Sequence, residues 1–181
     1  NNTRGAQNVA MGPNTLLYNK GNNGSTAIGY QAMMNPDTSE FFPEQRTTYN
    51  TAIGYESLKG NYPPWNNTGT DNTATGAHTL KNNSAGSGNV AIGSRALFTN
   101  TTGNTNIAIG RSALYSNTDK SNLMAIGDSA LFYNTTGNMN LAFGASALKS
   151  NVSGSSNLAI GAFAWTSSTD GTSNIAVGRE A

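Results

Sequence analysis

The sequence predicts an all-β solenoid, in which the chain winds through ten coils of about 17 residues each. Two observations lead to this fold class. The phrase Ala-x-Gly returns along the whole chain, and from Gly76 to Gly178 its glycine recurs every 17 residues. The apolar runs are about four residues long and are bounded by Asn, Gly or Thr, so helices of ~10–12 residues do not fit. Stacked coils of short strands and turns would bury such runs against their neighbours.

The glycine that closes each phrase marks one coil of a single domain covering residues 1–181. Successive markers are 17 residues apart except on the two sides of Gly54, where the gaps are 25 and 22 residues. The extra residues are expected as loop insertions near 35–49 and 60–71. The ten markers are Gly12, Gly29, Gly54, Gly76, Gly93, Gly110, Gly127, Gly144, Gly161 and Gly178.

The first element of each coil is a strand that ends at the marker, as in "NIAIG" at residues 106–110. Side chains alternate along a strand, so Ile107 and Ile109 share one face and Ala108 takes the other. Both faces are apolar, whereas one narrow coil has only one interior, so the second face is expected to pack on other copies of the chain. The residues assigned to core and intersubunit packing are Ala91, Ile92, Ala108, Ile109, Ala125, Ile126, Ala142, Phe143, Ala159 and Ile160.

The marker glycine and the residues after it are expected to form a corner and a return path. Glycine permits backbone angles that other residues avoid, and it allows close approach at a corner. Leu usually stands four residues after the marker, as at Leu97 and Leu114. This segment is interpreted as a second strand, and a short helical turn is the alternative.

Asn recurs four residues before the marker, as at Asn89 and Asn106, and seven residues after it, as at Asn100 and Asn117. Stacked coils place equivalent residues ~4.8 Å apart. At that spacing the side-chain amides can form hydrogen-bonded ladders along the stack. The repeated Asn positions are therefore predicted to be structural.

Composition excludes several classes of protein. Charged residues make up 10% of the chain and the formal net charge is +1, so neither disorder nor a nucleic-acid partner is expected. No run approaches the ~20 apolar residues of a membrane helix, so direct insertion into a membrane is not expected. The repeat is already under way at both ends, and the chain is interpreted as a piece of a longer protein.

The phrases "NVAIGSRAL", "NIAIGRSAL" and "NLAIGAFAW" resemble the repeats in the YadA-like heads of trimeric autotransporter adhesins. Similar arrays occur in phage tail fibres and in trimeric surface fibres of predatory bacteria. The resemblance covers nearly the whole chain, but the 17-residue period is longer than the common adhesin repeat. It implies a left-handed parallel β-roll, with three chains side by side in a homotrimer.

The resemblance also implies the function: an adhesin head on a bacterial or phage surface fibre that presents a binding surface for a glycan or protein receptor. The expected location is extracellular, at the cell surface or on the virion. The alternative is a purely structural shaft whose binding tip lies elsewhere. The neck, stalk and membrane barrel of the adhesins have no counterpart in these residues.

Enzyme chemistry finds little support in the residues, and no cofactor is expected. The chain has one histidine, His78, and no cysteine. His78 is interpreted as a solvated coil residue, with a ligand contact as the alternative. The aspartates follow no regular register, so a repeated metal site is not expected.

Two columns of equivalent residues are candidates for binding surfaces. Threonines one period apart, beginning at Thr101, could suggest an ice-binding face, but paired threonines point to different faces of the chain. Phe98, Tyr115 and Phe132 also align one period apart. They are interpreted as packing at a coil edge or between chains, and an exposed binding stripe is the alternative.

The two insertions concentrate aromatic residues, prolines and charges that the regular coils lack. Loops carried on a rigid scaffold are frequent binding sites. Because both insertions follow the same strand in successive coils, they are expected to project side by side from one edge. One hypothesis is that the insertions form a recognition surface. The alternative is that they pack on each other and only cover that edge. The candidate ligand-binding residues are Phe41, Phe42, Glu44, Arg46, Tyr62 and Trp65.

Overall fold

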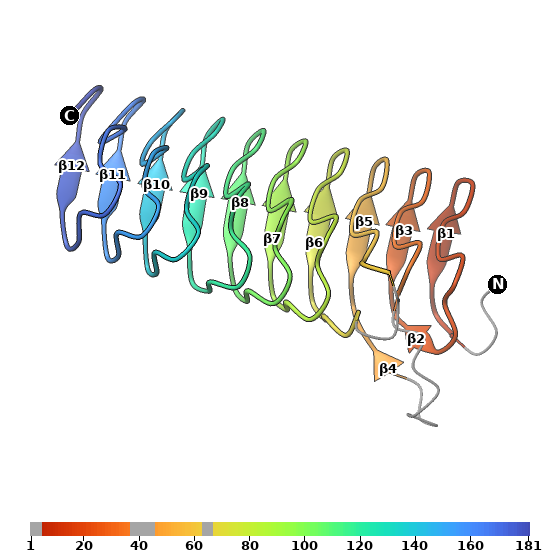
Figure 1. The fold of residues 1–181 in the computed structure, drawn as a ribbon. Coiled ribbons are helices and arrows are strands. Elements are labelled where there is room, and N and C mark those ends of the chain that lie inside the picture. Colours follow the sequence, from red (N-terminus) through yellow and green to blue (C-terminus); the bar gives the residue numbers. More distant parts are fainter. Residues whose placement is uncertain (1–4, 37–45, 63–66) are drawn as a thin grey trace.

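The computed structural model of the chain describes residues 5–36, 46–62 and 67–181 (Figure 1). In this part the protein is an all-β solenoid without helices, and its coils stack into a rod. Ten three-residue strands, one from each coil, form one parallel sheet in chain order, which confirms the predicted fold class. These strands are β1 (Val9–Met11), β3 (Thr26–Ile28), β5 (Thr51–Ile53), β6 (Thr73–Thr75), β7 (Val90–Ile92), β8 (Ile107–Ile109), β9 (Met124–Ile126), β10 (Leu141–Phe143), β11 (Leu158–Ile160) and β12 (Ile175–Val177).

The register of the sheet follows the repeat. Ala108 of β8 pairs with Ala91 of β7 on one side and Ala125 of β9 on the other. The same register holds across the longer gaps, where Ala27 pairs with Ala52 although 25 residues separate them. The two insertions therefore do not change the register of the strands in the sheet. The short strands β2 (Asn22–Asn23) and β4 (Arg46–Thr47) form a separate parallel pair beside them.

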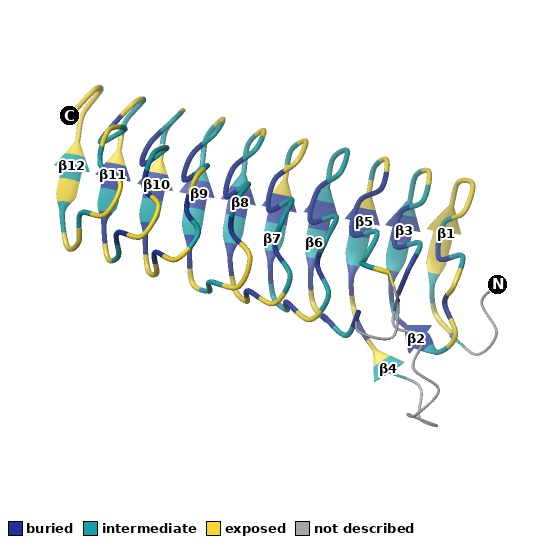
Figure 2. Ribbon diagram, viewed as in Figure 1, coloured by how far each residue is buried: buried dark blue, intermediate teal, exposed yellow. Residues whose placement is uncertain are grey.

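The core is narrow and runs the length of the rod (Figure 2). The alanine of each strand from β3 to β11 is fully buried, and it packs with an alanine and a leucine that follow three and four residues after the marker, such as Ala113 and Leu114. The strand residues on either side of each alanine point outward and are half-buried or exposed. The inward alanine and outward large residues agree with the alternation predicted from the sequence.

The return path of the regular coils differs from both readings of the sequence. Neither a strand nor a helix follows the marker in residues 67–181. The backbone angle φ is positive at Gly110 (130°), Ser112 (57°) and Leu114 (52°), and this alternation breaks both regular conformations. Instead the Ala113 N–H donates to Gly110 within the coil, and the Leu114 N–H donates to Ala130 of the next coil.

Gly110 meets both requirements that the sequence suggested for the marker. Its φ of 130° lies where side chains are disfavoured. A Cβ at this position would also collide with the backbone carbonyl of Gly127 in the next coil. The marker glycine thus permits both the corner and the close stacking of successive coils.

The predicted asparagine ladders are present. In the column after the marker, Asn117 Nδ2 donates to Asn100 Oδ1 (3.0 Å), and Asn100 Nδ2 donates to Asn83 Oδ1 (2.9 Å). In the column before it, the Asn106 N–H donates to Asn89 Oδ1 (2.9 Å). These amides are buried, so the ladders supply hydrogen bonds that water cannot reach.

Candidate binding surfaces

The outward face of the sheet is apolar over six successive strands. Each strand from β7 to β12 turns two side chains outward, and none of the twelve is fully buried. Phe143 is 53% exposed and Ile175 is 76% exposed. An extended row of exposed apolar side chains is typical of a surface that binds a partner. The row consists of Val90, Ile92, Ile107, Ile109, Met124, Ile126, Leu141, Phe143, Leu158, Ile160, Ile175 and Val177.

The same face is more polar over β3, β5 and β6, whereas β1 again turns the apolar Val9 and Met11 outward. Threonine occupies the first outward position of β3, β5 and β6, and Thr75 occupies the second outward position of β6. Ile28 and Ile53 are the apolar residues of these three strands that point outward. The continuous apolar row therefore begins at β7.

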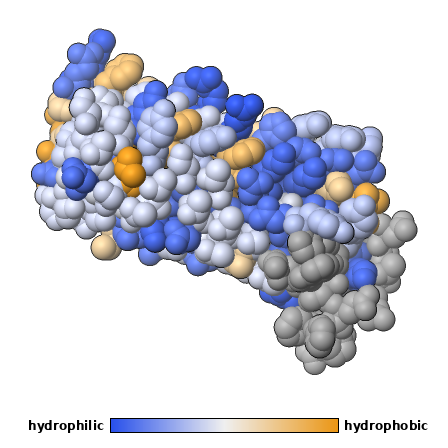
Figure 3. Space-filling view, in the orientation of Figure 1, coloured by the Kyte–Doolittle hydropathy of each residue, from blue (hydrophilic) through white to orange (hydrophobic). Residues whose placement is uncertain are grey.

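The part of the surface that is visible in Figure 3 is mainly polar. The view in Figure 3 shows hydrophilic side chains over most of the face in sight, with scattered hydrophobic ones. Arg111 forms an ion pair with Asp128 at 2.9 Å. This contact raises the pKa of Arg111 and lowers the pKa of Asp128. Both side chains are largely exposed, so the pair contributes little to stability.

The candidate residues of the insertions divide into two groups. Phe41, Phe42, Glu44 and Trp65 lie outside the described residues. Arg46 lies in β4, where its Nη2 donates to the Thr68 carbonyl oxygen at 2.9 Å. Tyr62 is 83% exposed. Arg46 thus links the bases of the two insertions, whereas Tyr62 is open to a ligand.

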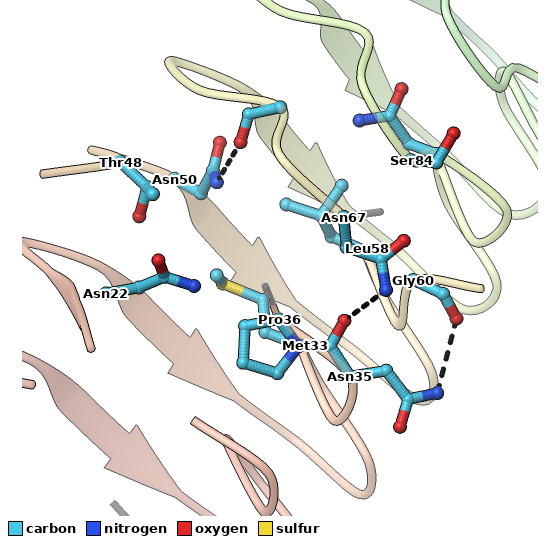
Figure 4. A pocket seen from close by; sticks show the side chains of 12 residues that line it. Asn22, Met33, Asn35, Pro36, Thr48, Asn50, Leu58, Gly60, Asn67 and Ser84 are labelled. Carbon is cyan, nitrogen blue, oxygen red and sulfur yellow. Dashed lines mark hydrogen bonds between the residues drawn. The ribbon is translucent and has the colours of Figure 1, made fainter. Parts of the chain in front are cut away.

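The bases of the two insertions lie side by side, as the repeat register predicted (Figure 4). Asn67 Nδ2 donates to the Asn35 carbonyl oxygen (2.5 Å) and to the Asn61 carbonyl oxygen (2.8 Å). Asn35 Nδ2 lies 3.4 Å from the Gly60 carbonyl oxygen. One asparagine side chain therefore joins the segment before the first insertion to the segment before the second.

A small cavity of about 20 Å³ lies at this junction. Met33, Pro36 and Leu58 line it together with the polar side chains of Thr48 and Asn50 (Figure 4). A water molecule needs about this much space. The cavity is therefore too small for a sugar ring or an amino-acid side chain, and it is not a ligand pocket of ordinary size.

The aromatic column stacks ring on ring along the rod. The centroids of Phe98 and Tyr115 are 5.2 Å apart with an interplanar angle of 1°, and those of Tyr115 and Phe132 are 4.9 Å apart with an angle of 2°. The rings are half-buried and cover one another's faces. This geometry favours the packing interpretation, because a ligand could reach mainly the ring edges.

His78 is not a freely solvated residue. Its side chain is half-buried, and its Nδ1 lies 3.1 Å from Oε2 of Glu56. Glu56 was not among the residues predicted from the sequence to form a site. It is buried, and it also pairs with Lys59 and Lys81. The signal was available, because both lysines stand five residues after a marker and so fall in one column.

Residues 5–36, 46–62 and 67–181 contain no candidate metal-binding group and no candidate membrane-spanning helix. Within these ranges, the side chains of His, Cys, Asp and Glu form no group of three or more that could hold a metal ion. The same ranges contain no helix with the length and apolar character needed to cross a membrane. Compared with protein-family models, curated proteins and solved structures, the chain matches none of them.

Proposed function

We propose that this chain is a segment of a homotrimeric surface fibre, an adhesin head in which three rods pack through the outward faces of their sheets. The observation that supports this proposal most directly is the apolar row on β7–β12, which is exposed in the single chain. Burial of such a row stabilises an assembly by roughly 25 cal/mol for each Å² of apolar surface removed from water.

A second copy of the same chain suits this row better than an unrelated protein. The row carries no charged residue, and depletion of charge is typical of the core of a protein interface. It also repeats with each coil, so rods of equal pitch can match it over its length. Copies arranged around one rotation axis bury the face in every chain, as closed symmetric oligomers do.

We call the residues that follow the marker glycine of each coil, such as Ser112 in the coil of Gly110, the turn side of the rod. In such an assembly the turn side and the insertions would face away from the axis. Tyr62 and the base of the insertions would then be available to a glycan or protein receptor on a target cell. The protein would act outside the cell, at a bacterial surface or on a phage tail fibre. An alternative function is a structural shaft, which the regular stacking of residues 67–181 favours.

The oligomeric state tests the assembly. Light scattering of the purified chain should give the mass of three copies. The double variant Ile109→Asp with Ile126→Asp places two charges on the outward row and should give monomers. The matched control, Ser112→Asp with Ser129→Asp, adds the same charge to the turn side of the same coils and should remain trimeric. A stable wild-type monomer at micromolar concentration would contradict the proposal.

Binding assays separate the adhesin from the shaft. Purified trimer should bind to cells or to particular glycans on an array if it is an adhesin head. A shaft should bind to none of them, although it would form the same trimer.

A further inference from the structure

Glu56 is the centre of a charged cluster on the turn side of the rod. The residue is 7% exposed. Its Oε1 accepts a hydrogen bond from Lys59 Nζ (2.6 Å), and its Oε2 lies 2.7 Å from Lys81 Nζ. Lys59 Nζ also donates to Gln31 Oε1 at 2.8 Å. One buried carboxylate thus holds the ammonium groups of two successive coils.

The carboxylate stays ionised over the whole ordinary pH range. Burial by itself would raise the pKa of Glu56, but the hydrogen bonds and charges of Lys59 and Lys81 outweigh it and lower the pKa to about 2. The two ammonium groups therefore always face a negative charge, which fixes them in place.

A third cation extends the cluster to the next coil. Arg95 stands two residues after its marker, as Glu56 and His78 do in the two coils before it. The backbones of these turns are stacked, because the Arg95 N–H donates to Ala77 and the His78 N–H donates to Tyr55. Arg95 is exposed, and its side chain contacts no partner among the described residues.

The cluster has an excess of positive charge that three other ion pairs of the described residues lack. Three cations, Lys59, Lys81 and Arg95, accompany one carboxylate, so two positive charges remain. The net charge of the whole chain is only +1. The other ion pairs described each join one cation to one carboxylate: Arg111 with Asp128, Lys120 with Asp119, and Arg179 with Glu180.

The ammonium groups keep hydrogen-bond donors for a ligand. An ammonium group has three N–H donors. Lys59 uses two of them, for Gln31 and Glu56, and Lys81 uses one for Glu56. Both side chains remain partly exposed, at 21% and 27%. Because the buried carboxylate already orders the lysines, a ligand would not have to immobilise them.

Aromatic rings flank the cations. Tyr55 is half-exposed, and its ring meets the His78 ring edge-on at 5.1 Å. On the other side, Lys81 Nζ lies 5.9 Å from the centre of the Phe98 ring. A ligand that contacts the cations would therefore also meet the Tyr55 side chain, which offers apolar area beside its hydroxyl group.

We propose that Lys59, Lys81 and Arg95 form a binding site for an anionic polysaccharide that runs along the rod across the coils of β5, β6 and β7. Lys59 and Lys81 come from successive coils and Arg95 comes from the next coil, so the cations are spread over three coils of the rod, which suits an extended polymer better than a single compact anion. A nucleic acid fits less well, because its binding proteins commonly neutralise about 6–10 phosphates. Carboxylate and sulfate groups both suit charge-assisted hydrogen bonds from ammonium and guanidinium groups.

The test uses the full chain and immobilised polysaccharides. The wild-type protein should bind alginate, which carries carboxylates, or heparin, which carries sulfates, and it should not bind neutral dextran. Binding should weaken steeply with salt. The preferred polymer distinguishes carboxylate from sulfate recognition. Failure to bind either anionic polymer at low salt would overturn the proposal.

Matched variants assign the binding to this cluster. The double variant Lys81→Gln with Arg95→Gln should weaken binding at least about tenfold, as the loss of two charge-assisted contacts predicts. The control, Lys149→Gln with Arg179→Gln, removes the same charge elsewhere and should stay within about twofold of wild type. Equal losses in both double variants would overturn the proposal, because they would indicate unspecific attraction.

Two further measurements complete the test. Arg95→Gln alone should weaken binding while its melting temperature equals that of wild type, since the side chain is exposed and unpaired within the described residues. Poly-glutamate that binds as tightly as the polysaccharides would overturn the proposal in favour of an acidic protein partner. The site lies within one chain, so a monomeric protein that binds alginate or heparin would contradict the trimer but not this inference.

Discussion

The coils of residues 67–181 and those before residue 62 share one repeat but differ in how strictly they keep it. In the C-terminal region every marker gap is 17 residues, the outward sheet face is apolar from β7 onward, and asparagine ladders join Asn83 to Asn117 and Asn134 to Asn151. The N-terminal region has one 17-residue gap, but the gaps on the two sides of Gly54 are 25 and 22 residues, and threonine enters the outward face.

The features that both regions keep are those that the stack requires. The inward alanine of the strand and the marker glycine persist in both regions, because neighbouring coils touch at these positions. Outward and loop residues vary, because they do not contribute to the register of the sheet. The unbalanced charge of Glu56, Lys59 and Lys81 and the small cavity both lie at or near the irregular coils.

The largest effect is expected at a glycine of the regular region. Gly110→Ala should lower the free energy of unfolding by more than about 3 kcal/mol, because its φ is 130° and the added methyl group would collide with Gly127. Gly21→Ala in the N-terminal region meets no atom within 4 Å and should change stability by less than about 0.5 kcal/mol. Chemical denaturation measures both, and equal effects would refute the stacking role of the marker.

The pH dependence of stability should come mainly from the irregular region. The pKa of Glu56 is about 2 in the folded protein against 4.5 as its ordinary value. Its stabilisation of about 3 kcal/mol is therefore fully present above pH 4.5 and is lost as the pH falls toward 2. Glu56→Gln should remove this dependence, whereas Asp128→Asn at the exposed pair should leave it nearly unchanged. Denaturation at several pH values between 2 and 7 measures the difference.

Overpacking should show how tightly the regular coils are built. Ala108→Leu adds bulk to a position that is fully buried between stacked strands, and it should cost ~1–3 kcal/mol in each chain. Lys149→Leu changes a half-buried side chain on the turn side of the same region and should be tolerated. If both variants melt at the same temperature, the assignment of the alanine column to the core is wrong.

The smallest effect on stability, and the sharpest test of the insertions, is expected at Tyr62. The side chain is 83% exposed, so Tyr62→Ala should change the free energy of unfolding by less than about 0.5 kcal/mol. If the insertions recognise a receptor, the variant should bind target cells or glycans more weakly. Tyr133→Ala removes a half-exposed tyrosine from the regular region and should leave that binding intact. Unchanged binding in Tyr62→Ala would remove this residue from the recognition surface.

The repeat pattern is sufficient to predict the solenoid, its register and the main roles of residues within a coil. A strict period forces equivalent residues to stack, so the repeated alanine had to be a contact between coils and the repeated asparagine a ladder. The side-chain alternation at Ile107, Ala108 and Ile109 also predicts which face points inward and which points outward.

The return path and the burial of the polar cluster depend on contacts between coils that the repeat pattern does not specify. Ser112 and Leu114 do not favour a positive φ by themselves, and they adopt it because the stacked coils fix the backbone around them. The repeat register places Glu56, Lys59, Lys81 and His78 in two successive coils, but it does not show that the carboxylate is buried and contacts both ammonium groups. The repeat pattern determines which residues recur in each coil. Contacts between coils determine which charged side chains are buried together.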